Sequence, residues 1–76
     1  MSGTVWSRSW PCGSATVTLL VRQPGAGHRQ ASVEWSCGAP PALVGEQVSH
    51  YLAGLATAKR DMERAFGYAL PISGGL

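Results

Sequence analysis

Three short segments in the first half of the chain alternate apolar and polar residues, as strands do when one side of a sheet is buried. They cover residues 4–10, 15–22 and 30–37. Stretches typical of turns, 11–14 and 24–27, separate them. Because consecutive strands joined by short turns usually pair with one another, the pattern predicts an antiparallel meander with the second strand in the centre.

The second half of the chain carries a helical pattern from Pro40 to Phe66. A Pro at the first position is a helix start signal, and Gly67 suits the position just after the end. Gly45 and Gly54 each cost about 1 kcal/mol in a helix interior, so we expect one of them to permit tight packing. Apolar residues recur at steps of three and four, widened by Leu52 and Phe66: Val44, Val48, Tyr51, Leu55, Ala58, Met62, Ala65 and Ala69.

Together these segments predict a single small α+β domain over residues 1–76. A three-stranded antiparallel β-meander at about 4–37 packs on one long C-terminal α-helix at about 40–67, in the order βββα. A tail, 68–76, follows. We expect its apolar part, up to Ile72, to fold back on the domain and the rest to fray.

The predicted helix is too long for the predicted sheet. About 27 residues at a rise of ~1.5 Å make ~40 Å, whereas strands of about seven residues are only ~23 Å long. The last third of the helix would then overhang, and its apolar side chains would need a partner. We therefore expect Arg60, Met62, Arg64 and Phe66 to contribute to a partner-binding surface.

A sheet with one helix leaves its other face open, and the first strand could turn its large residues to either side. Trp6, Arg8 and Trp10 share one side of that strand. Buried, the two Trp side chains would supply much of the core. Exposed, they would form a strip beside Leu20 and Arg22. The residues expected on the open face are Thr16, Thr18, Leu20, Arg22, Ser32, Glu34 and Ser36.

Composition narrows the classes of partner. With 45% hydrophobic and 13% charged residues, the chain has the balance of a folded domain and not of a disordered tail. Its net charge of +2 is mild, so nucleic acid is allowed as a partner but not indicated. Only four Asp and Glu residues are present, which argues against an acidic mimic of nucleic acid.

Localisation and chemistry are predicted mainly by what the sequence lacks. It shows neither a secretory signal nor an apolar run long enough to span a bilayer, so we expect a cytoplasmic protein without a membrane partner. Cys12 and Cys37 would then be thiols. No metal-ligand spacing of Cys or His occurs. We also see no nucleophile, base and orienting group placed together, and we expect no cofactor, no metal and no enzymatic activity.

The predicted layout of three strands and a long Ala-rich helix resembles small phage-encoded inhibitor proteins of the anti-CRISPR type. The resemblance covers most of the chain as size and element order. It carries no shared motif, and therefore no functional residue. It implies an inhibitor that docks on a bacterial defence nucleoprotein complex and blocks it sterically.

We therefore expect a non-enzymatic protein-binding module, possessing two partner-binding surfaces. One alternative is a small homodimer with a structural or regulatory role. Another is a weak single-stranded nucleic-acid binder that uses the open sheet face. The residues expected to bind a partner are Trp6, Arg8, Trp10, Leu20 and Arg22 on the sheet, with Arg60, Met62, Arg64 and Phe66 on the helix.

Overall fold

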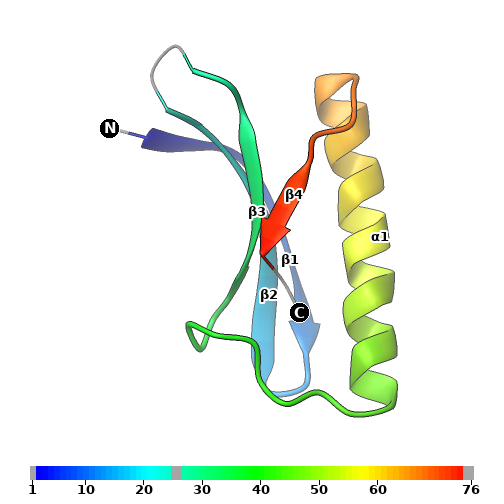
Figure 1. Ribbon diagram of the computed structural model, residues 1–76. Helices are drawn as coiled ribbons and strands as arrows, with labels where there is room; N and C mark the ends of the chain where they lie inside the picture. Colours follow the sequence, from blue (N-terminus) through cyan, green and yellow to red (C-terminus); the bar gives the residue numbers. More distant parts are fainter. Residues whose placement is uncertain (1, 25–26, 75–76) are drawn as a thin grey trace.

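In the part of the chain that the structure describes, the protein folds as one sheet with a single helix along one face (Figure 1). The computed structural model describes residues 2–24 and 27–74. The elements are β1 (Ser2–Cys12), β2 (Ala15–Pro24), β3 (Gln30–Trp35), α1 (Glu46–Phe66) and β4 (Ile72–Gly74).

The sheet is mixed and has the strand order β1-β2-β3-β4. The pairs β1–β2 and β2–β3 are antiparallel, and β4 lies parallel to β3. The predicted α+β class and the meander are confirmed, but the sheet gains a fourth strand that the prediction lacked. Because β3 and β4 are parallel, the chain must cross between them, and α1 forms this crossover.

The first two strands are longer than the predicted segments. β1 has 11 residues and β2 has 10, joined by a two-residue turn at Gly13 and Ser14. Gly13 has φ 63, a left-handed conformation that suits this kind of hairpin. The second predicted turn, 24–27, includes Gly25 and Ala26, which lie outside the described residues.

The tail folds back, as predicted, and then joins the sheet. Leu70 is buried in the core, and Ile72 pairs with Ala31. The Ser73 hydroxyl donates a hydrogen bond of 3.3 Å to the carbonyl of Ala31. The prediction that Ser73 and Gly74 fray is therefore wrong, and the remaining part of that prediction, 75–76, lies outside the described residues.

The helix begins at Glu46, not at Pro40. Gly45 has φ 50, outside the helical region, and Pro41 disfavours helical geometry at the residue before it. Val44, expected on the apolar face of the helix, is 73% exposed. At the other end the prediction is confirmed, because Gly67 adopts the left-handed conformation and its N–H bonds to the Glu63 carbonyl at 2.7 Å.

The corrected lengths remove the predicted overhang. A helix of 21 residues is ~31 Å long, and a strand of 10 residues is ~33 Å long. Met62, assigned to the overhang, is 0% exposed. The sheet therefore supports the helix along its whole length.

The core lies between α1 and the sheet, and Gly54 sets how closely the two approach. A Cβ atom at residue 54 would overlap the indole ring of Trp10, so the expectation that one helical glycine permits tight packing is confirmed. Tyr51 stacks on Trp35 with ring centroids 5.3 Å apart. The core residues are Cys12, Ala15, Val17, Leu19, Val21, Ala31, Val33, Trp35, Tyr51, Ala58, Met62 and Leu70.

Candidate functional site

In Figure 1 no described helix or strand covers the face of the sheet opposite α1, as predicted. The strand register places mainly small hydroxyl side chains on this face. Two pairs tie neighbouring strands together there. The hydroxyls of Ser9 and Thr18 lie 2.8 Å apart, and Arg22 donates to Glu34 at 3.0 Å. Residues on this face therefore satisfy much of their own hydrogen bonding.

Leu20 points to the open face but offers little surface to a partner. Leu20 is only 5% exposed. It lies on β2 between Ser7 of β1 and Ser32 of β3. Arg22, the other residue expected to bind there, is already paired with Glu34. The open face thus lacks an exposed apolar anchor at its centre.

Trp6, Arg8 and Trp10 lie on the helix side of β1, so the alternative in which they form a strip beside Leu20 is wrong. They stand opposite the helix-facing residues of β2. Trp6 and Trp10 are half-buried against the core. Arg8 remains half-exposed and forms an ion pair with Asp61 of α1. This pairing offsets the partial loss of water that Arg8 undergoes between β1 and α1.

The end of the helix is likewise occupied by contacts within the protein. Phe66 meets Trp6 edge-to-face, with ring centroids 6.5 Å apart, and Arg29 lies 4.8 Å above its ring. Arg29 also donates to the Tyr68 hydroxyl at 3.1 Å. With Met62 in the core, only two of the four helix residues expected to bind a partner, Arg60 and Arg64, are exposed.

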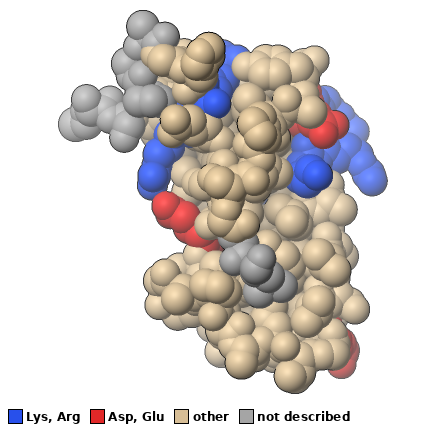
Figure 2. Space-filling model, viewed as in Figure 1, with Lys and Arg blue, Asp and Glu red and all other residues tan. Residues whose placement is uncertain are grey.

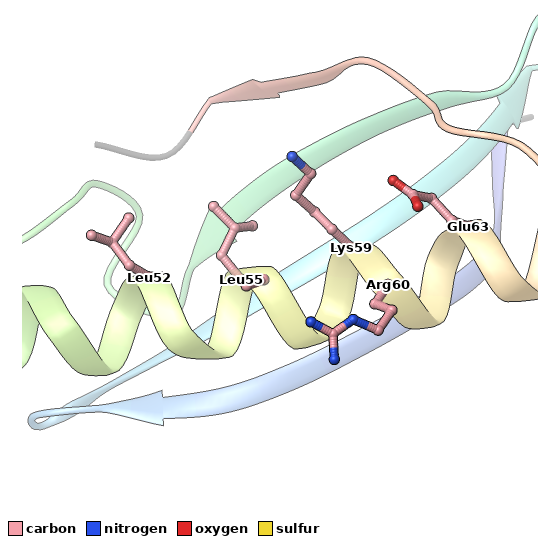
Figure 3. Close-up of a pocket in the computed structure, with 6 residues that line it drawn as sticks. Leu52, Leu55, Lys59, Arg60 and Glu63 are labelled. Carbon is pink, nitrogen blue, oxygen red and sulfur yellow. The ribbon is translucent and has the colours of Figure 1, made fainter.

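A shallow groove of about 370 Å³ runs along one flank of α1 (Figure 3). Every residue that lines it belongs to the helix. In Figure 3, Leu52, Leu55, Lys59 and Glu63 point toward the side where β3 and β4 lie, and Arg60 points to the opposite side. The lining residues are Leu52, Leu55, Ala56, Lys59, Arg60 and Glu63.

The groove exists because α1 is not centred on the sheet. The helix contacts β1 and β2 and leaves β3 and β4 to one side. Tyr51 reaches toward β3 and stacks on Trp35, which closes the core. Leu52, the next residue along the helix, has no strand above it among the described residues, and it is 54% exposed.

The groove changes character along its length. Leu52, Leu55 and Ala56 make one half apolar, and Lys59, Arg60 and Glu63 make the other half charged. Among the described residues, none of these three charged side chains has an ion-pair partner within 4.0 Å. The groove therefore combines exposed apolar surface with charges that are free to meet a ligand.

The apolar half of the groove adjoins an uncharged end of the molecule. The segment 36–45 has no charged residue, and most of it is exposed. In Figure 2 the Lys and Arg side chains gather in the upper part of the view, and the lower part is almost free of charge. A second hollow of about 430 Å³ lies beside β3 between Trp35 and Gly74, the last described residue.

The described part of the chain brings together no group of side chains suited to metal binding, and its two cysteines form no disulfide. Among the described residues, no cluster of three or more His, Cys, Asp or Glu side chains is present. Cys12 is buried and bonds to the Gln47 carbonyl at 3.4 Å, whereas Cys37 is exposed and bonds to the Ala39 carbonyl at 3.0 Å. Both cysteines are free thiols.

Sequence reasoning missed the groove because it assigned Leu52 to the apolar face that packs on the sheet. A signal was available in the spacing. Leu52, Ala56, Lys59 and Glu63 follow steps of four, three and four, the spacing of a seam between two helices.

Comparison with known proteins yields no relative. No family model, curated protein or solved structure matches the chain significantly. Within the described residues, no helix has the length and apolar character needed to cross a membrane.

Proposed function

We propose that this chain is a non-enzymatic protein-binding module that docks its partner in the groove along α1. The observation that carries this proposal is the apolar surface of Leu52 beside Lys59 and Arg60, two cations without an ion-pair partner among the described residues. Protein interfaces commonly combine an apolar anchor with charged groups at its rim.

The groove is a better candidate than the open sheet face. That face was one of the two surfaces expected from sequence, but its central Leu20 is buried and its Arg22 is paired. It also carries no aromatic side chain among the described strand residues, because Trp6 and Trp10 turn to the helix. Single-stranded nucleic acid would need such a stacking platform, so we do not favour that alternative.

Inhibition of a bacterial defence nucleoprotein complex is one role that such a module would fill. The resemblance in size and layout to small phage-encoded inhibitors of the anti-CRISPR type motivates this part of the proposal. Steric blocking needs a docking surface and no catalytic group. We place this activity in the cytoplasm, where such a complex is found.

A homodimer is the competing structural role, and it predicts a different occupant for the groove. The overhanging helix end, which would have paired two copies, does not exist. Two copies would now have to meet along α1. Light scattering at high micromolar concentration separates the two roles, because the proposed module is a monomer without its partner.

The proposal is tested by affinity capture from a bacterial lysate with Leu52→Glu and a matched control, Ala53→Glu. Ala53 is exposed and adjacent but does not line the groove. We expect Leu52→Glu to lose the captured partner and Ala53→Glu to retain it. Equal capture by both variants contradicts the groove as the docking site.

A further inference from the structure

We infer that the groove along α1 accepts one amphipathic α-helix of a partner protein, which carries carboxylates about one turn away from its apolar residues. This inference rests on the proposed function and specifies the chemistry of the partner. Three observations support it: the origin of the lining residues, their spacing and the distribution of their charge.

The lining residues favour a helix over an extended peptide. All of them are side chains of α1, whose backbone groups are already bonded within the helix. An extended peptide in this groove would lose water from its own N–H and C=O groups, and no strand residue lines the groove to replace that water. A helix bonds its backbone internally and needs only side-chain contacts.

The spacing of the lining residues gives the expected length of the partner helix. Leu52, Ala56, Lys59 and Glu63 follow the steps of four, three and four that place residues along one helix–helix seam. From Leu52 to Glu63 the seam runs about 11 residues, or ~16 Å. A partner helix of about three turns would fill it.

Ala56 lies in the middle of this seam. Because its side chain is a single methyl group, a second helix can approach α1 more closely there than at Leu52 or Lys59. A larger residue at this position would hold the two helices apart. The groove thus has its closest approach at the boundary between its apolar and charged halves.

The charges of the groove select the charges of the partner. Lys59 and Arg60 follow the apolar half directly, and Glu63 lies one turn farther on. The lining residues therefore carry a net charge of +1, two cations less one carboxylate. A partner with Glu or Asp opposite Lys59 gains a favourable contact. Arg60, which points to the other side of the helix, adds positive charge at the rim of the groove, so a partner with Lys there meets repulsion.

Two displayed peptide libraries, selected in parallel on the purified protein, test this inference. One randomises the exposed face of a stable helical hairpin, and the other is a linear 12-residue library. We expect binders from the helical library only, with Glu or Asp enriched about one turn away from the apolar positions. Linear binders of extended, Pro-rich sequence, binders without charge bias, or no binders at all would overturn the inference.

A charge-reversed protein provides the matched control. On the double variant Lys59→Glu and Arg60→Glu, the same helical library should return Lys or Arg at the positions where the wild type returns Glu or Asp. A wild-type binder should bind this variant at least about tenfold more weakly. If charge reversal leaves both the selection and the affinity unchanged, the acidic character of the partner is disproved.

Failure of the lysate capture and failure of the library selection lead to different conclusions. If Leu52→Glu loses the captured protein but the helical library returns no acidic binders, the groove remains the docking site and the proposed partner chemistry is rejected. If Leu52→Glu captures the partner as well as the wild type does, the docking site itself is rejected. If light scattering shows a dimer that Leu52→Glu dissociates, a second copy occupies the groove, and the inference falls.

Discussion

The two flanks of α1 differ in how they meet the rest of the molecule. On the flank that faces β1, Gly54 allows the helix to pack closely against Trp10, and Asp61 forms an ion pair with Arg8. On the opposite flank, Leu52 and its neighbours line an open groove. The helix is thus held from one side, and among the described residues the groove on its other side has no partner.

This comparison shows why residue type alone does not identify a binding surface. Trp6, Arg8 and Trp10 of β1 were expected as anchors for a partner, but they pack against the closed flank of the helix. The open flank carries leucines and cations that an ordinary surface helix also has. What distinguishes them is position, because the helix is displaced toward β1 and β2.

The largest difference between buried and open helix positions should appear in stability. Met62→Ala removes a side chain that has no exposed surface, and we expect it to lower the free energy of unfolding by about 2–5 kcal/mol. Leu52→Ala should cost less than about 1 kcal/mol, because much of its surface is already in water. Urea unfolding of both variants measures the difference, and equal losses would contradict the assignment of the two positions.

The close approach on the β1 flank makes Gly54→Ala the next largest effect. The added methyl group would overlap the indole of Trp10, so we expect a loss of about 1–3 kcal/mol. At a helix position without such a contact, Gly→Ala stabilises by up to about 1 kcal/mol.

A double-mutant cycle with Trp10→Leu shows whether the indole is the cause. A smaller side chain at residue 10 should relieve the overlap, so the double variant should lose less than the sum of the two single losses. If the losses of the two single variants simply add up in the double variant, the indole of Trp10 is not the cause of the destabilisation by Gly54→Ala.

The ion pair on the same flank should contribute less. Asp61→Asn removes the partner of Arg8, whose side chain is 50% exposed, and we expect a loss of about 0.2–1 kcal/mol that shrinks as salt is added. Glu63→Gln on the open flank is the matched control, since Glu63 has no ion pair among the described residues, and it should change stability less. The reverse order would show that Glu63 has a partner in solution.

The smallest effect on stability is expected at the groove itself. Leu52→Glu and Ala53→Glu should each change the free energy of unfolding by no more than about 0.5 kcal/mol, as is usual for exposed positions. Thermal unfolding monitored by circular dichroism checks this. A large loss for Leu52→Glu would mean that Leu52 supports the core, and any loss of binding by that variant could then not be assigned to the groove.

Much of the fold could be predicted because strand alternation and helical spacing are local properties. The three antiparallel strands and the end of the helix at Gly67 were found in this way. The start of the helix was misplaced because Pro40 looks like a first helical residue, whereas the left-handed Gly45 determines the actual start. β4 was missed because a strand of three residues is too short to show the alternation of apolar and polar positions. It also pairs with β3 only because α1 returns the chain to that strand.

The candidate site was less predictable, since it depends on contacts between distant residues. Arg8 could be assigned to the helix side only by knowing that Asp61, 53 positions later, lies against it. The exposure of Leu52 depends on the lateral position of α1 over the sheet, which periodicity does not encode. Spacing could have suggested a helix–helix seam, but not which flank of the helix was free.

The most direct test of the docking site is photo-crosslinking at defined positions. Variants carrying benzoylphenylalanine in place of Leu52, Ala53 or Thr18 are irradiated in a bacterial lysate; these positions sample the groove, the neighbouring helix surface and the open sheet face. We predict a discrete crosslinked protein at Leu52 and none at Ala53 or Thr18. Crosslinking at Thr18 without crosslinking at Leu52 would contradict the account and return the binding surface to the open face of the sheet.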